Sequence, residues 1–88
     1  MLRIIVKEND DGSEVRLSGR LAGEYVAEAK QVCFSAAEPL LIDATELQDA
    51  DADGFALLAK LIDGGARVEG LSGYLAMRVD ALRRRSRS

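Results

Sequence analysis

Leu2, Ile4 and Val6 alternate with Arg3, Ile5 and Lys7, and apolar and polar residues alternate again over residues 14–18. A period of two is typical of a β-strand. The segment between them, Asn9-Asp10-Asp11-Gly12, favours a tight turn, because Asp-Gly tolerates positive φ. The pattern predicts a β-hairpin with strands at residues 2–6 and 15–17. A loop bracketed by Gly19 and Gly23 follows, with Leu21 pointing inward.

The period changes at Glu24. Apolar residues then recur at helical spacing, at Val26, Ala29, Val32, Cys33 and Ala36. This amphipathic helix is expected to stop near residue 38, because Pro39 disfavours helical geometry in the residue before it. The short apolar run at residues 40–42 that follows is typical of a central strand.

Residues 54–62 are apolar almost all round, with Lys60 as the one charge. This pattern predicts a helix that is buried on most sides or that meets a partner with its free face. The helix should end at Gly64-Gly65 and be followed by a strand at residues 66–69. Ser72 is a suitable cap for a last helix with Leu75, Val79 and Leu82 on one stripe. The predicted order is β-β-α-β-α-β-α, an α/β domain with a mixed sheet flanked by helices.

The length of 88 residues allows one domain, expected at residues 1–82. Hydrophobic residues make up 48% and charged residues 31%, which argues against disorder. No apolar stretch approaches the roughly 20 residues that span a membrane. The first residues turn acidic early and make a poor signal peptide, so we expect a cytoplasmic protein with no direct membrane insertion.

The chain has no histidine and one cysteine. This excludes Ser-His-Asp and Cys-His catalysis, zinc sites that depend on imidazole, and an internal disulfide. Cys33 falls on the apolar side of its helix, so we interpret it as a small buried residue rather than a reactive thiol. We expect no cofactor.

The net charge of −3 is unevenly distributed. Arginines 83, 84, 85 and 87 lie at the C-terminus, which leaves residues 1–82 with eight basic and 15 acidic side chains. An acidic body repels nucleic acid, so no nucleic-acid partner is expected. Residues 83–88 are predicted to be a solvated, disordered basic tail whose first arginines favour a helix C-terminus.

Residues 49–54 read Asp-Ala-Asp-Ala-Asp-Gly, which begins like a calcium loop. Such a loop also needs a bidentate glutamate at its twelfth position, and that position is Lys60. We therefore predict no metal site. A catalytic pair of carboxylates is a second interpretation, but a domain of this size has little volume for a substrate cleft, and we expect no enzyme. A third interpretation is that Asp51 and Asp53 cap the following helix.

One stretch resembles a known family. Residues 40–58, LLIDATELQDADADGFALL, resemble the core of the STAS domain (sulfate transporter and anti-sigma factor antagonist), with a strand-end aspartate at Asp43 and a Ser/Thr at Thr45. Asp51 and Gly54 fall on the aspartate and glycine of the motif that opens an apolar helix. Upstream, VRLSGRL at residues 15–21 looks like the second strand of the family and its Gly-x-Leu turn. The order of elements agrees over residues 2–82.

The resemblance implies a bacterial, non-enzymatic protein-binding module. Antagonists of this family sequester an anti-sigma factor, often a serine kinase, and so regulate transcription. The surface expected to contact the partner consists of Asp51, Ala52, Asp53, Gly54, Phe55 and Leu58.

The chain departs from the family at its regulated position. Ala52 occupies the place of the phosphorylated serine and Asp53 that of the second serine. Without a hydroxyl at Ala52, a serine switch cannot operate there. Two alternatives therefore stay open. One is a STAS-like accessory subunit of a membrane (lipid) transport ATPase, which needs no phosphoacceptor, and the other is a small-ligand or metal binder using Asp49, Asp51 and Asp53.

Overall fold

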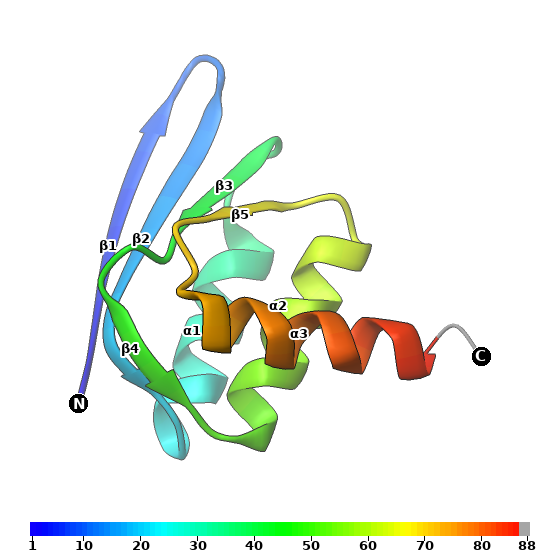
Figure 1. Cartoon of the computed structure of the whole chain (residues 1–88). Coiled ribbons are helices and arrows are strands. Elements are labelled where there is room, and N and C mark those ends of the chain that lie inside the picture. The colour runs from blue at the N-terminus through cyan, green and yellow to red at the C-terminus, as the bar shows by residue number, and fades with distance from the viewer. Residues whose placement is uncertain (87–88) are drawn as a thin grey trace.

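The computed structural model of the chain describes residues 1–86. In chain order its elements are β1 (Leu2–Asn9), β2 (Gly12–Leu21), α1 (Glu24–Ser35), β3 (Leu40–Asp43), β4 (Leu47–Ala50), α2 (Ala52–Asp63), β5 (Arg67–Glu69) and α3 (Gly73–Ser86) (Figure 1). The α/β class and the mixed sheet expected from the sequence are confirmed.

The sheet is built around β2. The hairpin strand β1 pairs antiparallel with it, while β3 and β4 both pair parallel with it. β3 lies beside residues 13–16 of β2 and β4 beside residues 19–21, so the two short strands follow one another along the same side of β2. β5 pairs parallel with β3 and forms the far edge of the sheet.

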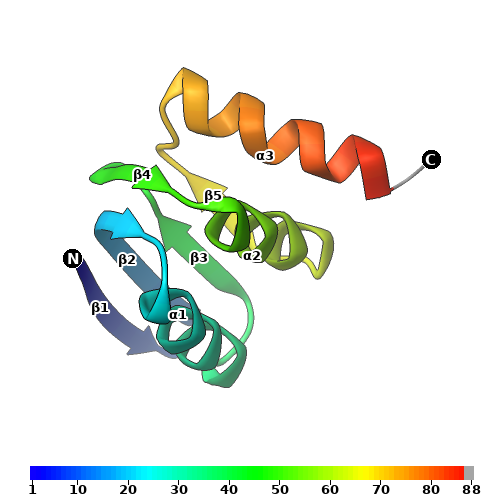
Figure 2. The same ribbon diagram turned by 90° about the horizontal axis from the view of Figure 1, so that it is seen from below.

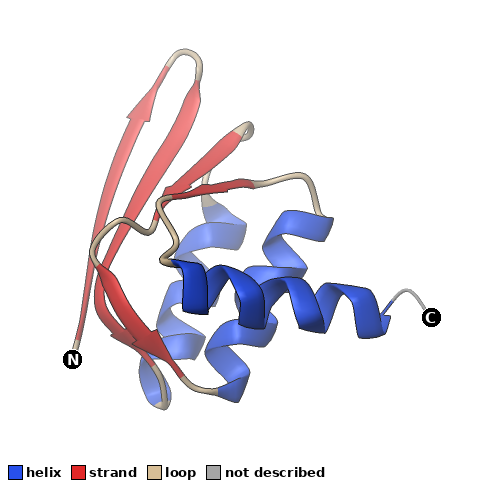
Figure 3. Ribbon diagram, viewed as in Figure 1, coloured by secondary structure: helices blue, strands red, loops and turns tan. Residues whose placement is uncertain are grey.

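The molecule has two layers. The three helices lie on one face of the sheet, and the opposite face carries no helix (Figures 1, 2 and 3). That uncovered face is mostly polar, with ion pairs between Arg16 and Asp43 (3.4 Å) and between Arg67 and Glu69 (2.9 Å). These partly exposed pairs add little stability, but they keep the uncovered face hydrated.

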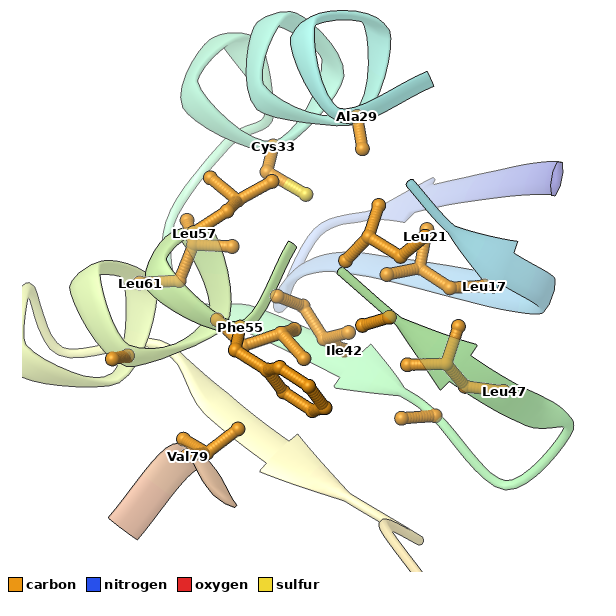
Figure 4. Packing of buried hydrophobic residues seen from close by; sticks show 14 of the residues in the cluster. Leu17, Leu21, Ala29, Cys33, Ile42, Leu47, Phe55, Leu57, Leu61 and Val79 are labelled. Atoms are coloured by element: carbon orange, nitrogen blue, oxygen red, sulfur yellow. The ribbon is translucent and has the colours of Figure 1, made fainter. Parts of the chain in front are cut away.

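The core lies between the two layers, and α2 is its central helix (Figure 4). Phe55 and Leu58 of α2 are 2% and 0% exposed, and Leu17 and Ile42 of the sheet are fully buried. Burying a side chain of this size contributes about 1.5–3 kcal/mol. The apolar pattern of residues 54–62 therefore reflects a helix that contacts the sheet, α1 and α3.

The structure differs from the sequence predictions at several places. β4 was not predicted. The hairpin strands are longer than expected, and β2 continues to Leu21 through the start of the expected loop. The first helix ends at Ser35 rather than near residue 38, because the backbone of Ala36 is already extended. The last helix continues to Ser86, so residues 83–86 are not a disordered tail, and only residues 87–88 of that predicted tail lie outside the described part.

The arginines explain the longer helix. Arg83 donates from Nε to Asp63 of α2 at 2.8 Å, and Arg84 pairs with Asp80 one turn earlier at 2.9 Å. The expectation that the first arginines favour a helix C-terminus is confirmed, since three of them fill the last turn of α3.

Cys33 is 3% exposed, and its burial raises the pKa of the thiol to about 11. A protonated thiol is a poor nucleophile, so the interpretation of Cys33 as a core residue is confirmed. Within residues 1–86, no helix combines the length and apolar composition that crossing a bilayer requires.

Candidate functional site

Asp51 is the N-cap of α2 and also holds a second segment. Its Oδ1 accepts a hydrogen bond from the backbone N–H of Gly54 at 2.8 Å, which satisfies one of the free amides of the first turn. Its Oδ2 accepts from the backbone N–H of Gly23 at 2.8 Å, in the loop before α1. One carboxylate thus ties the start of α2 to the start of α1.

These bonds set the charge state of Asp51. The N–H groups of Gly23 and then Gly54 stabilise the carboxylate, and the Arg20 guanidinium adds a smaller attraction, so the pKa of Asp51 lies below its usual value. Asp51 is therefore ionised at neutral pH, as its capping role requires.

The start of α2 lies so close to the end of β2 that residue 54 has to be a glycine. A Cβ at this position would lie 2.2 Å from the carbonyl oxygen of Leu21 and 3.1 Å from Cβ of Ala50. The same carbonyl accepts a hydrogen bond from the N–H of Asp51 at 3.1 Å. We call residues 21–23 and 51–54 the junction. The aspartate and glycine of the motif at residues 49–54 are thereby explained as structural residues.

The predicted contact residues divide into two groups. Ala52 and Asp53 are exposed on the first turn of α2. Gly54, Phe55 and Leu58 are buried. The ring of Phe55 points into the core (Figure 4), and Leu58 belongs to the same buried cluster. The expectation that Phe55 and Leu58 contact a partner is therefore wrong for this structure, because both side chains are buried in the core.

The exposed stripe of α2 runs instead through Ala52, Ala56 and Lys60. Beside it lies a groove of about 390 Å³ between α1 and α2. We call it the α1–α2 groove, and it is lined by Gly23, Val26, Ala27, Lys30, Asp53, Ala56, Leu57 and Lys60. Its surface is largely apolar, and its polar side chains are two lysines and one aspartate.

The two lysines belong to opposite walls. Lys30 comes from α1 and Lys60 from α2, and no ion pair of either is found among residues 1–86. The Lys60 Nζ lies 5.8 Å from the ring centroid of Phe34, an α1 side chain that is 54% exposed. This cation–π contact leaves the ammonium accessible to a carboxylate.

The first interpretation of residues 49–54, a metal site, meets an obstacle in the geometry. Both oxygens of Asp51 accept backbone N–H groups, and Asp49 faces Arg20 at 3.8 Å. Over residues 1–86, no group of three carboxylate, thiolate or imidazole side chains is close enough to hold a metal ion.

The sequence pattern did not predict the role of Gly23 or the α1–α2 groove. Gly23 was recognised only as a loop residue, although its φ of 60° places it where glycine is favoured. The groove depends on how α1 and α2 pack side by side, which no local pattern encodes. Its one detectable signal is that two of the three lysines of the chain lie on predicted helices.

Comparison with known proteins adds no assignment: no family model matches the chain, and no curated protein matches it.

Proposed function

We propose that this chain is a non-enzymatic protein-binding regulatory module of the kind its resemblance to anti-sigma factor antagonists implies. It docks a protein partner through Ala52 and Asp53 and through the α1–α2 groove. The observation that carries the proposal is the junction, which fixes the start of α2 by internal bonds while leaving the side chains of Ala52 and Asp53 exposed.

A surface fixed in this way suits recognition. Binding orders side chains and loops at an entropic cost, and a preformed surface avoids part of that cost. Asp51 and Gly54 hold the backbone of the first turn, so a partner meets it in one conformation. The groove beside it provides apolar area with charged groups at its rim, which is the usual composition of a docking surface.

Ala52 separates this module from kinase-regulated antagonists. It is exposed where the regulated serine of the family lies, and it offers no hydroxyl to a kinase. Docking is therefore not switched by phosphorylation at this position. The same observation favours a second candidate function, an accessory subunit of a membrane transport ATPase, because that role requires a constant contact rather than a switch.

The test is capture of the partner with matched variants. Wild-type protein is immobilised, extract of the source cells is passed over it, and retained proteins are identified by mass spectrometry. Ala56→Arg places a long side chain in the α1–α2 groove. Ala81→Arg makes the same change on an exposed position of α3 away from the groove.

We expect one protein to be retained by wild type and by Ala81→Arg and lost with Ala56→Arg. An anti-sigma factor supports the first candidate, and a transporter ATPase supports the second. Equal retention by both variants would place the contact elsewhere and overturn the proposal.

A further inference from the structure

The hairpin strand β1 leaves one edge of the sheet unpaired. It pairs with β2 on its inner side, and no strand among the described residues pairs with its outer side. Figure 2 shows β1 at the margin of the sheet. β1, with the sequence LRIIVKEN, has eight residues, which is long enough for a second strand to pair along its outer side.

The direction of the backbone groups follows from one hydrogen bond. The carbonyl of Met1 accepts from the N–H of Arg20, so odd-numbered residues of β1 direct their backbone groups towards β2. Leu2, Ile4, Val6 and Glu8 therefore direct their N–H and C=O groups outward. We call this row the β1 edge.

The middle of the β1 edge is apolar on both faces. Ile5 is 39% exposed on the face without helices, and Val6 is 42% exposed on the helix-covered face. Exposed apolar side chains beside free backbone groups are the features that favour pairing with another strand.

The two ends of this strand carry opposite charge. Arg3 lies near its start, while its end and the turn carry three acidic side chains, Glu8, Asp10 and Asp11, and one basic side chain, Lys7, so that this end is acidic overall. An antiparallel copy of the same strand places the basic end of one chain beside the acidic end of the other. The charge pattern is thus complementary to itself.

We propose that the β1 edge binds a second copy of this chain, forming a two-fold dimer in which the two sheets join antiparallel. In such a dimer, facing residues lie on the same side of the joined sheet, so their numbers differ by an even amount. Centring the pair on Ile5 would set Arg3 against Lys7 twice, which is unfavourable. Centring it on Ile4 would shorten the ladder to residues 2–6.

The register centred on Val6 avoids both problems. Val6 then faces Val6 of the other copy, Ile5 faces Lys7, and Arg3 faces Asn9 beside the acidic turn. The ladder covers residues 3–9. The stem of Lys7 can cover Ile5 while its ammonium stays hydrated.

This register makes opposite predictions for two substitutions of one residue. Ile5→Glu and Ile5→Lys both remove the apolar side chain. Glutamate would face Lys7 of the other copy, whereas lysine would repel it. Because each change occurs twice in the dimer, we expect the dissociation constants of the two variants to differ by roughly tenfold or more, with Ile5→Glu the tighter dimer.

Val6→Pro tests the backbone ladder directly. The N–H of Val6 points outward, so proline removes a donor of the dimer without removing one from the β1–β2 ladder. Sedimentation equilibrium of the intact chain over a range of concentrations is the measurement, with thermal melts to confirm that each variant folds. Wild type should approach twice the 9.5 kDa mass of the chain, and Val6→Pro should remain a monomer.

A wild-type chain that stays monomeric at the highest concentration measured overturns the proposal. So does a dimer that Val6→Pro leaves intact, or one that Ile5→Glu and Ile5→Lys affect equally. The β1 edge is separate from the α1–α2 groove, so none of these outcomes bears on the proposed function.

Discussion

The junction and the β1 edge differ in whether their backbone groups are hydrogen-bonded within the chain. At the junction, the N–H groups of Gly23 and Gly54 are both bonded to Asp51, and the carbonyl of Leu21 is bonded as well. At the β1 edge, alternate backbone groups face outward with no strand opposite them. Both regions are near the surface, but only the junction has its backbone hydrogen bonds completed within the chain.

The difference indicates where a substitution should act. A change at the junction breaks bonds inside the molecule and should lower its stability. A change to the outward backbone groups of the β1 edge removes no ladder hydrogen bond of the single chain and should alter association. Exposure alone does not make this distinction, because Asp51 and Val6 are both partly accessible.

The largest effect expected at the junction is that of Gly54→Ala. The new Cβ would lie 2.2 Å from the Leu21 carbonyl oxygen, so the start of α2 and the end of β2 would have to separate. Overpacking of this kind costs about 1–3 kcal/mol, more than the gain of up to about 1 kcal/mol from replacing a helical glycine. Chemical denaturation should show a lower free energy of unfolding.

Gly73→Ala is the matched control. Gly73 begins α3, and a Cβ there has nothing within 4 Å. The control should be neutral or stabilising, by up to about 1 kcal/mol. If both variants are equally stable, the close approach at Gly54 has no energetic role.

Asp51→Asn should have a smaller and pH-dependent effect. The pKa of Asp51 is lowered in the folded state by the N–H groups of Gly23 and Gly54, so folding favours the ionised form. Its contribution is complete above the usual value of 3.8 and is lost as the pH falls through the lower folded value. Wild type should therefore be the more stable protein at neutral pH.

The stability difference between wild type and Asp51→Asn should shrink as the solution is acidified below the usual pKa. Asp43 has a pKa lowered by its hydrogen bonds with Thr45 and would destabilise both proteins together in acid, so the difference between them isolates Asp51. Thermal melts across this pH range provide the measurement. A difference that does not change with pH would mean that the charge of Asp51 is not what stabilises the junction.

The sequence predicted the parts of the fold that depend on local chemistry. The alternation in β1 and β2, the buried α2 and the capping role of Asp51 all follow from patterns within a few residues. Ser72 also acts as expected, since its Oγ accepts from the N–H of Leu75 at 3.4 Å.

The parts it missed depend on distant contacts. β4 has only four residues, of which Leu47 and Ala50 are buried and Gln48 is exposed, and it is a strand because it lies beside the end of β2. α3 extends through the arginines partly because Arg83 reaches Asp63 on another helix. The burial of Phe55 and Leu58 likewise depends on how α2 packs against the sheet and the other helices. The family resemblance, from which both were assigned to the partner surface, does not encode that packing.

The smallest effect on stability is expected for Ala52→Glu, which instead tests the exposed half of the first turn. Ala52 is exposed and its side chain makes no bond that the fold requires. A carboxylate there gains from the helix N-terminus but lies beside Asp51 and Asp53, so stability should change by no more than about 0.5 kcal/mol. Affinity for the captured partner should fall, because the added charge must be desolvated against the docked surface.

Ala52→Ser is the control of similar size without charge and should bind like wild type. Calorimetric titration of the partner with the three proteins measures the affinities, alongside thermal melts. Equal affinity of Ala52→Glu and wild type would show that the partner does not contact this turn.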